Sequence, residues 1–200
     1  MKTTPCIPAR LMPSTRAFLL RVSRLLAAIT LGSLLPACHD SPQTCFERAV
    51  LNTNFMHGFA GRAMEQELDT PSVKLTGAKP GETAPMTRKE VVDAKISFVE
   101  DSLTRVRRLR QTDDNRDIIQ ASIALHEHVL RVYRDEYQQL ARLYDTGAPK
   151  AEIARLTAAI ATNHGPPFQA LSAKLTTAGK AYATRHSIKV IWDVRTSPSP

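Results

Sequence analysis

The densest group of side chains able to bind a metal ion or move protons is His126-Glu127-His128. On a helix, side chains two positions apart point about 200° away from each other, so these two histidines do not share a metal ion. The spacing also differs from His-Glu-x-x-His, in which the two metal ligands lie one turn apart. One hypothesis is that His57 and His126 meet inside a helical bundle and bind a metal there. The alternative, which the sequence favours, is that His126 is a hydrogen-bonded core histidine.

A second group able to do chemistry is a run of arginines at the C-terminal end of a predicted helix, namely Arg105, Arg107, Arg108 and Arg110. Guanidinium groups bind phosphates and carboxylates, so this cluster is a candidate surface for an acidic partner. Cations are also favoured at a helix C-terminus by the helix dipole, and this second interpretation requires no partner.

Motifs for catalysis are not evident in the chain. There is no Gly-x-Ser-x-Gly elbow and no glycine loop of the kind that binds phosphates, and no Cys-x-x-Cys-His indicates covalent haem. The carboxylates of Glu127 and Glu136 are predicted to lie on different faces of their helix. We therefore expect a binding protein that is not an enzyme and that has no cofactor.

The net charge of +8 is concentrated at the N-terminus. Residues 1–37 contain five basic residues and no acidic one, so 22 of the 27 basic residues remain against 19 acidic ones beyond that point, a balance of about +3. Basic and acidic residues are interleaved beyond residue 37, and aromatic residues make up only 6% of the chain, which argues against nucleic acid as a partner.

The basic N-terminal residues precede an uncharged run from Leu25 to Leu35, and Leu35-Pro36-Ala37-Cys38 follows. A run of 11 residues suits the apolar part of a signal peptide and is too short to span a bilayer. The sequence around Cys38 resembles the lipobox of bacterial lipoprotein precursors. Translation starts at Met1 or at Met12, and the sequence leaves that choice open.

The lipoprotein resemblance implies that residues 1–37 are a signal peptide, cut off before Cys38, and that Cys38 is then acylated. Residues 38–43 would be a short tether that holds the protein close to the membrane. His39 follows the cysteine in place of the aspartate that retains enterobacterial lipoproteins in the inner membrane. We therefore expect an outer-membrane lipid anchor facing the periplasm, although Asp40 leaves the inner membrane open.

The lipoprotein resemblance also implies that Cys45 has no partner for a disulfide bond, because Cys6 would leave with the signal peptide and Cys38 would carry lipid. Its thiol is therefore buried or available to another chain, and its position beside Phe46 favours burial.

The elements that position these residues are predicted from helical periodicity and capping signals. The sequence predicts an all-α fold, an antiparallel bundle of about four helices over residues 44–187. Apolar residues recur at helical spacing in four segments, 44–68, 87–110, 115–144 and 148–182. The expected capping boxes are Thr44 with Glu47 and Thr87 with Glu90. Residues 70–86 are predicted to be a connector without sustained helix or strand.

Details within these segments lead to further expectations. Gly58 and Gly61 either allow a close helix crossing or mark a break, and we expect close packing. One line of the third helix should face solvent: Asp117, His128, Arg131, Asp135, Gln138 and Arg142. Pro166 and Pro167 leave open whether the last segment is one kinked helix or two.

The C-terminal region, residues 188–195, is β-branched and alternating and therefore predicts a strand, before a disordered tail at 196–200. Its alternate positions are a candidate edge for binding a partner, namely Ile188, Val190, Trp192 and Val194. The alternative is that Trp192 caps one end of the bundle.

The sequence thus predicts a lipid-anchored helical bundle that binds or scaffolds a protein of the cell envelope. One version is an immunity protein against a secreted toxin. The alternative is a metal- or ligand-binding bundle that uses His57 and His126.

Overall fold

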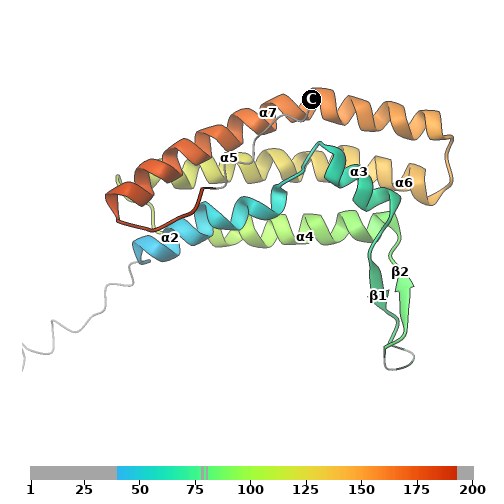
Figure 1. Ribbon diagram of the computed structural model, residues 1–200, viewed down its shortest axis with the longest axis horizontal. Coiled ribbons are helices and arrows are strands. Elements are labelled where there is room, and N and C mark those ends of the chain that lie inside the picture. The colour runs from blue at the N-terminus through green and yellow to red at the C-terminus, as the bar shows by residue number, and fades with distance from the viewer. Residues whose placement is uncertain (1–39, 78, 80, 193–200) are drawn as a thin grey trace, which may run out of the picture. The chain divides into compact units, whose positions relative to one another are not determined.

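The computed structural model describes residues 40–77, 79 and 81–192 (Figure 1). The predicted signal peptide, Cys38, Val194 and the C-terminal tail lie outside the described residues. The described part is mostly helical and contains one small antiparallel sheet, so the prediction of a helix-dominated chain is confirmed.

The first predicted helix is broken into three pieces, which corrects the expectation of one helix over 44–68. These are α2 (Pro42–Ala49), the 3₁₀ helix η1 (Leu51–Met56) and α3 (Arg62–Asp69). Ser41, not Thr44, is the N-cap of α2, and its hydroxyl accepts a hydrogen bond from the Thr44 N–H.

Gly58 explains the break between η1 and α3. Its φ is +87°, in the left-handed region, and a Cβ built there would lie 2.6 Å from the Ala63 Cβ. Only glycine fits both the dihedral angle and the close approach. Of the two roles considered for the glycines, Gly58 therefore marks a break.

The connector between the first and second segments contains a hairpin, contrary to the expectation that strands are absent there. β1 (Val73–Leu75) pairs antiparallel with β2 (Thr83–Pro85), with Lys74 opposite Ala84. The hairpin projects from the helices (Figure 1), and Val73 and Leu75 are 61% and 74% exposed. Lys74 forms an ion pair with Glu90 that ties β1 to the next helix.

The second helix, α4 (Arg88–Arg107), begins as predicted. Thr87 and Glu90 form a complete capping box, which satisfies two backbone donors of the first turn. The carboxylate of Asp145 accepts from the N–H groups of Arg88 and Lys89, each at 2.9 Å. A carboxylate at this end also complements the positive end of the helix dipole. The predicted apolar stripe is buried, with Val92, Val99 and Val106 fully enclosed.

The third helical segment runs through α5 (Arg116–Val132), a single π-helical turn η2 (Tyr133–Tyr137) and α6 (Gln138–Asp145). Asn115 is the N-cap of α5, but its amide holds the preceding turn instead of the first helical turn. Its Oδ1 accepts from the Thr112 N–H at 2.7 Å, and its Nδ2 donates to the Arg110 carbonyl at 3.0 Å.

The fourth segment is the single helix α7 (Lys150–Arg185), with Pro166 and Pro167 inside it. This resolves the two possibilities in favour of one helix, and its ribbon bends near the middle (Figure 1). Proline has no N–H to donate, so the carbonyls of Thr162 and Asn163 lose their usual acceptor role in the helix.

The core lies where α5 packs against α4 on one side and α7 on the other. Cys45 and Phe46 of α2 belong to this core, so Cys45 is buried as the sequence favoured. Leu125 and Val129 of α5 and Ile160 of α7 are also almost completely buried. None of the described helices is both long enough and apolar enough to cross a membrane.

The segment after α7 does not form the predicted strand within residues 188–192. Ile188, Val190 and Trp192 instead pack against the core, and the Trp192 ring meets Phe46 edge-on with centroids 6.0 Å apart. This arrangement matches the alternative in which Trp192 covers one end of the helices.

Candidate functional site

A surface groove of about 450 Å³ lies between α4 and the α5–η2 segment. Residues from both segments line it: Glu100, Leu103, Thr104, Arg107, Glu127, Leu130, Arg131 and Arg134. We call this the α4–α5 groove. It contains one arginine of the predicted cluster, Arg107, together with two that the sequence did not single out as a binding site.

Two ion pairs bridge the α4–α5 groove. Arg107 Nη2 lies 2.7 Å from Glu127 Oε1, and Arg134 pairs with Glu100 in the same way. Each side chain is roughly half exposed, so each pair contributes at most about 1 kcal/mol to stability. Their main effect is to hold the charged groups in place.

Arg131 lies between these pairs in sequence and lines the same groove. Among the described residues it has no carboxylate partner, and its Nη2 donates a hydrogen bond to His128 Nδ1 at 3.3 Å. Leu103 and Leu130 also line the groove, but they are only 3% and 8% exposed. The groove therefore offers a cation among mostly polar and charged side chains.

His128 lies behind Arg131 and is 8% exposed, which corrects its assignment to the solvent-facing line. Arginine is a donor only, so the His128 Nδ1 accepts and the proton of the neutral ring is on Nε2. That Nε2 is buried and has no partner with good hydrogen-bond geometry among the described residues. Burial lowers the pKa of His128, and the charges of His164 and Arg131 lower it further, while the nearby His164 backbone acts in the opposite direction.

His164 continues this cluster into α7. Its ring centroid lies 5.6 Å from that of His128, and its Nε2 contacts the carboxylate of Glu136 in η2. Together His128, His164 and Glu136 form a partly buried polar group that joins α5, η2 and α7. We call it the His128 cluster.

Three backbone irregularities meet beside the His128 cluster around the ring of Phe59. Phe59 follows Gly58, and its ring contacts His128, Tyr133 and Tyr137 with centroids 5.9, 5.5 and 6.1 Å away. Phe168, directly after the two prolines of α7, lies 5.0 Å away. The break before α3, the π-helical turn and the proline pair therefore lie close together, around the Phe59 ring. Such π-helical turns are frequent at functional sites.

The two histidines of the metal hypothesis are not brought together. His57 is exposed in the turn after η1, whereas His126 is fully buried. His126 Nδ1 donates to the Ser122 carbonyl at 2.8 Å, and its Nε2 accepts from the Ser102 hydroxyl at 2.9 Å. Both nitrogens are thus engaged, as in a core histidine. In the described part of the chain, no group of three or more His, Cys, Asp or Glu could hold a metal ion.

The other arginines of the predicted cluster lie near the end of α4, outside the groove lining. Arg105, Arg108 and Arg110 are exposed, and the Arg110 N–H reaches Asp40 Oδ2 at 3.5 Å. The sequence signal that was missed is the recurrence of Glu100 and Arg107 on α4 and of Glu127, Arg131 and Arg134 on the α5–η2 segment. These positions form one stripe on each of two helices that pack together.

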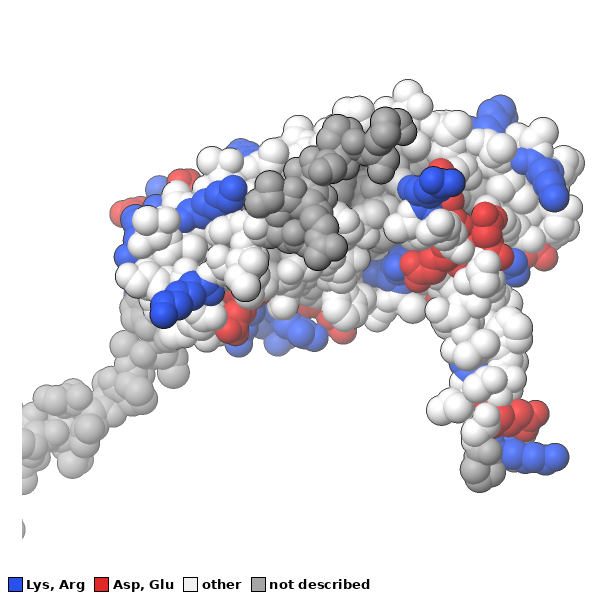
Figure 2. All heavy atoms as spheres, in the orientation of Figure 1, with Lys and Arg blue, Asp and Glu red and all other residues white. Residues whose placement is uncertain are grey.

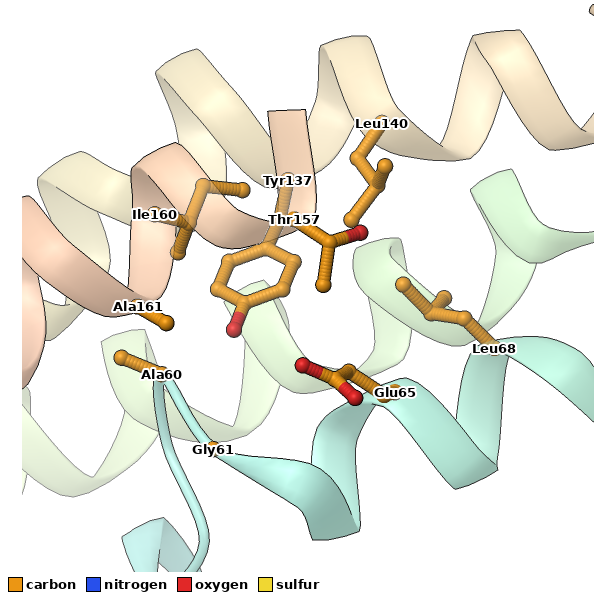
Figure 3. A pocket seen from close by; sticks show the side chains of 9 residues that line it. All are labelled: Ala60, Gly61, Glu65, Leu68, Tyr137, Leu140, Thr157, Ile160 and Ala161. Atoms are coloured by element: carbon orange, nitrogen blue, oxygen red, sulfur yellow. The ribbon is translucent and has the colours of Figure 1, made fainter. Parts of the chain in front are cut away.

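A second, much smaller cavity lies between α3, η2 and α7 (Figure 3). Figure 3 shows the Tyr137 hydroxyl and the Glu65 carboxylate at this cavity, among apolar side chains. Its volume is about 10 Å³, which is room for about one water molecule. It is therefore too small for an organic ligand.

Comparison with protein-family models, with curated proteins and with solved structures finds no match to this chain.

Proposed function

We propose that the chain is a lipid-anchored protein of the cell envelope whose helical domain, an antiparallel bundle of four helical segments, binds another protein. In this bundle α2, η1 and α3 together take the place of the first helix. The proposed anchor is acyl lipid on Cys38, in the outer membrane facing the periplasm. Neutralisation of a secreted toxin, as an immunity protein, is one form that such binding takes.

The observation that carries the proposed binding role is the α4–α5 groove with Arg131 in its lining. Arg131 lacks a carboxylate partner among the described residues, while its neighbours Arg107 and Arg134 are paired. A partner that places an Asp or Glu side chain on Arg131 would supply the carboxylate that Arg131 lacks. Arginine is also enriched among binding hot spots.

The groove is tested by site-specific photocrosslinking in cells that produce the lipidated protein. A crosslinking residue at Thr104, in the groove lining, should capture a discrete envelope protein. The same residue at Ala173, an exposed position of α7, is the matched control and should not capture it. Arg131→Gln should reduce the Thr104 crosslink, whereas Arg142→Gln on α6 should leave it unchanged. Equal crosslinking from both positions would contradict the proposed surface.

The anchor is tested separately through Cys38. Two or more acyl chains make membrane attachment effectively permanent, since one chain gives only marginal binding. Labelled fatty acid should therefore enter the normal protein, which should sediment with membranes. Cys38→Ala should abolish both results and leave unprocessed precursor or soluble periplasmic protein. A normal protein that incorporates no label, in a host that processes other lipoproteins, rules out the anchor.

A further inference from the structure

The net positive charge of the described domain is concentrated at one end. At the end where α2 begins, residues 40–48, 105–117 and 180–189 contain nine basic and five acidic residues. The rest of the described chain contains twelve basic and thirteen acidic residues. This end is therefore about +4, while the remainder is about −1. Figure 2 shows Lys and Arg side chains around this end.

Several acidic side chains at this basic end are paired with basic side chains of the same end. Asp114 contacts Arg185 and His186, and Asp113 contacts Arg116. Asp40 lies 3.2 Å from Arg48. The excess charge therefore comes from residues such as Arg105 and Arg108, which are exposed and for which no ion pair is found among the described residues. Their spacing of three places them next to each other on α4.

The proposed lipid anchor is attached at this same end. Asp40 is held against the domain by Arg48 and by the backbone N–H of Arg110. Cys38 precedes Asp40 by two residues, which span at most about 7 Å of chain. Each headgroup layer of a bilayer is about 5–7 Å thick. Acyl chains on Cys38 would thus hold Asp40, and the end of α4 with it, at the headgroup surface.

We infer that the basic end, through Arg105 of α4 and Arg108 at the C-cap of α4, binds anionic phospholipid headgroups and orients the helical domain on the membrane. This inference rests on the proposed anchor for the position of the domain, while the charge distribution supplies the attraction. Attraction between basic side chains and an anionic leaflet extends only about 8 Å at physiological salt. Charges on the far end of the domain therefore contribute little.

The inference is tested by arginine footprinting on the processed, lipidated protein in vesicles. One set contains phosphatidylcholine alone, and the other includes phosphatidylglycerol. Phenylglyoxal modification is followed residue by residue with mass spectrometry. Arg105 and Arg108 should react about fivefold more slowly in the anionic vesicles, the factor expected for one basic side chain at an anionic surface. Arg142 and Arg155, exposed on α6 and the start of α7, should react equally in both. High salt should remove the protection.

Equal reaction of Arg105 and Arg108 in the two vesicles, or equal protection of Arg142 and Arg155, would overturn the inference. If Cys38 proves to carry no lipid, the anchor fails, and the surface is tested with unanchored protein at low ionic strength. Arg105→Gln with Arg108→Gln should then lower affinity for anionic vesicles about 30-fold. The matched pair Arg142→Gln with Arg155→Gln should change it less than twofold. Similar losses from both pairs, or no binding by the unchanged protein, would also overturn the inference.

Discussion

His126 and His128 lie two residues apart on α5 and are both buried, yet their surroundings differ. His126 donates from Nδ1 to a backbone carbonyl and accepts at Nε2 from Ser102. His128 accepts at Nδ1 from Arg131 and has no partner at Nε2. The hydrogen-bond partners thus assign opposite tautomers to the two neutral rings.

The difference in hydrogen bonding identifies His126 as part of the structural framework of the helices. His126 links α5 to α4 in a regular part of both helices, and every polar atom of its ring is satisfied. His128 lies where the π-helical turn, the proline pair and the Gly58 break meet, and it connects the groove arginine to His164. A buried donor without a partner lowers stability by about 1–3 kcal/mol. The Nε2–H of His128 is therefore expected to be a destabilising group.

The largest expected effect is a difference in stability between two variants, in which the same substitution is made at His126 or at His128. His126→Leu removes a satisfied ring and leaves the Ser102 hydroxyl buried without its partner, so the free energy of unfolding should fall by about 2 kcal/mol. His128→Leu removes a buried donor without a partner, which is stabilising, but it also removes the acceptor of the Arg131 hydrogen bond, which is destabilising. The two effects oppose each other, so the free energy of unfolding should change by less than about 0.5 kcal/mol. Urea denaturation followed by circular dichroism measures both.

Ser102→Ala tests the same hydrogen bond from its other end and should lower the free energy of unfolding by about 1 kcal/mol. If the two His→Leu variants lose equal stability, the distinction between a framework ring and an unsatisfied ring is wrong.

The next effect is the dependence of stability on pH. Burial lowers the pKa of both histidines in the folded protein, so the unfolded chain binds more protons as the pH falls. The stability that the neutral rings provide is complete above the unfolded pKa of about 6.5 and is lost as the pH falls toward the folded values. Each histidine contributes at most about 1.4 kcal/mol per pH unit in that window.

Urea denaturation at pH 7.5 and pH 5.5 should therefore show lower stability at the lower pH. His126 is the more deeply buried ring, so His126→Leu should remove more of this difference than His128→Leu. A larger change from His128→Leu would reverse the order proposed for the two rings.

Much of the helical framework could be predicted from the sequence, because capping and periodicity are local. Thr87 with Glu90 identifies the start of α4, and the apolar stripe of α4 is buried as expected. The break at Gly58 was not predicted, because it depends on a contact with Ala63 that spacing does not reveal. The hairpin was missed because its strands are only three residues long and their pairing is not local.

The candidate groove was harder to predict than the helices that form it. The sequence places Arg131 on the solvent-facing side of α5. Only the packing of α4 beside α5 brings it near Arg107 and Leu103. His128 was placed on that same exposed line, because the sequence does not show that Phe59 and α7 cover it. The burial and neighbours of side chains at the boundary between two packed helices therefore could not be predicted without the structure. The burial of side chains in the middle of a helix's apolar stripe could be.

The smallest effect on stability, and the most specific test of the groove, is expected from Arg131→Gln. The Arg131 side chain lines an open groove, and its 3.3 Å bond to His128 is long, so the free energy of unfolding should change by less than about 0.5 kcal/mol. The charge of Arg131 nevertheless lowers the pKa of His128, after burial and His164. Removing that charge should raise the pKa of His128, which an NMR titration of the ring measures directly.

Arg134→Gln is the matched control, because it removes the same charge from the same groove while breaking the contact with Glu100 instead. It should leave the His128 titration close to that of the unchanged protein, and His126 should titrate alike in both variants. Since Arg131 would then connect a buried ring to the surface that a partner covers, a carboxylate placed on Arg131 would also raise the pKa of His128. Equal shifts from Arg131→Gln and Arg134→Gln would show that His128 responds only to the summed charge of the groove. The specific link through Arg131 would then be wrong.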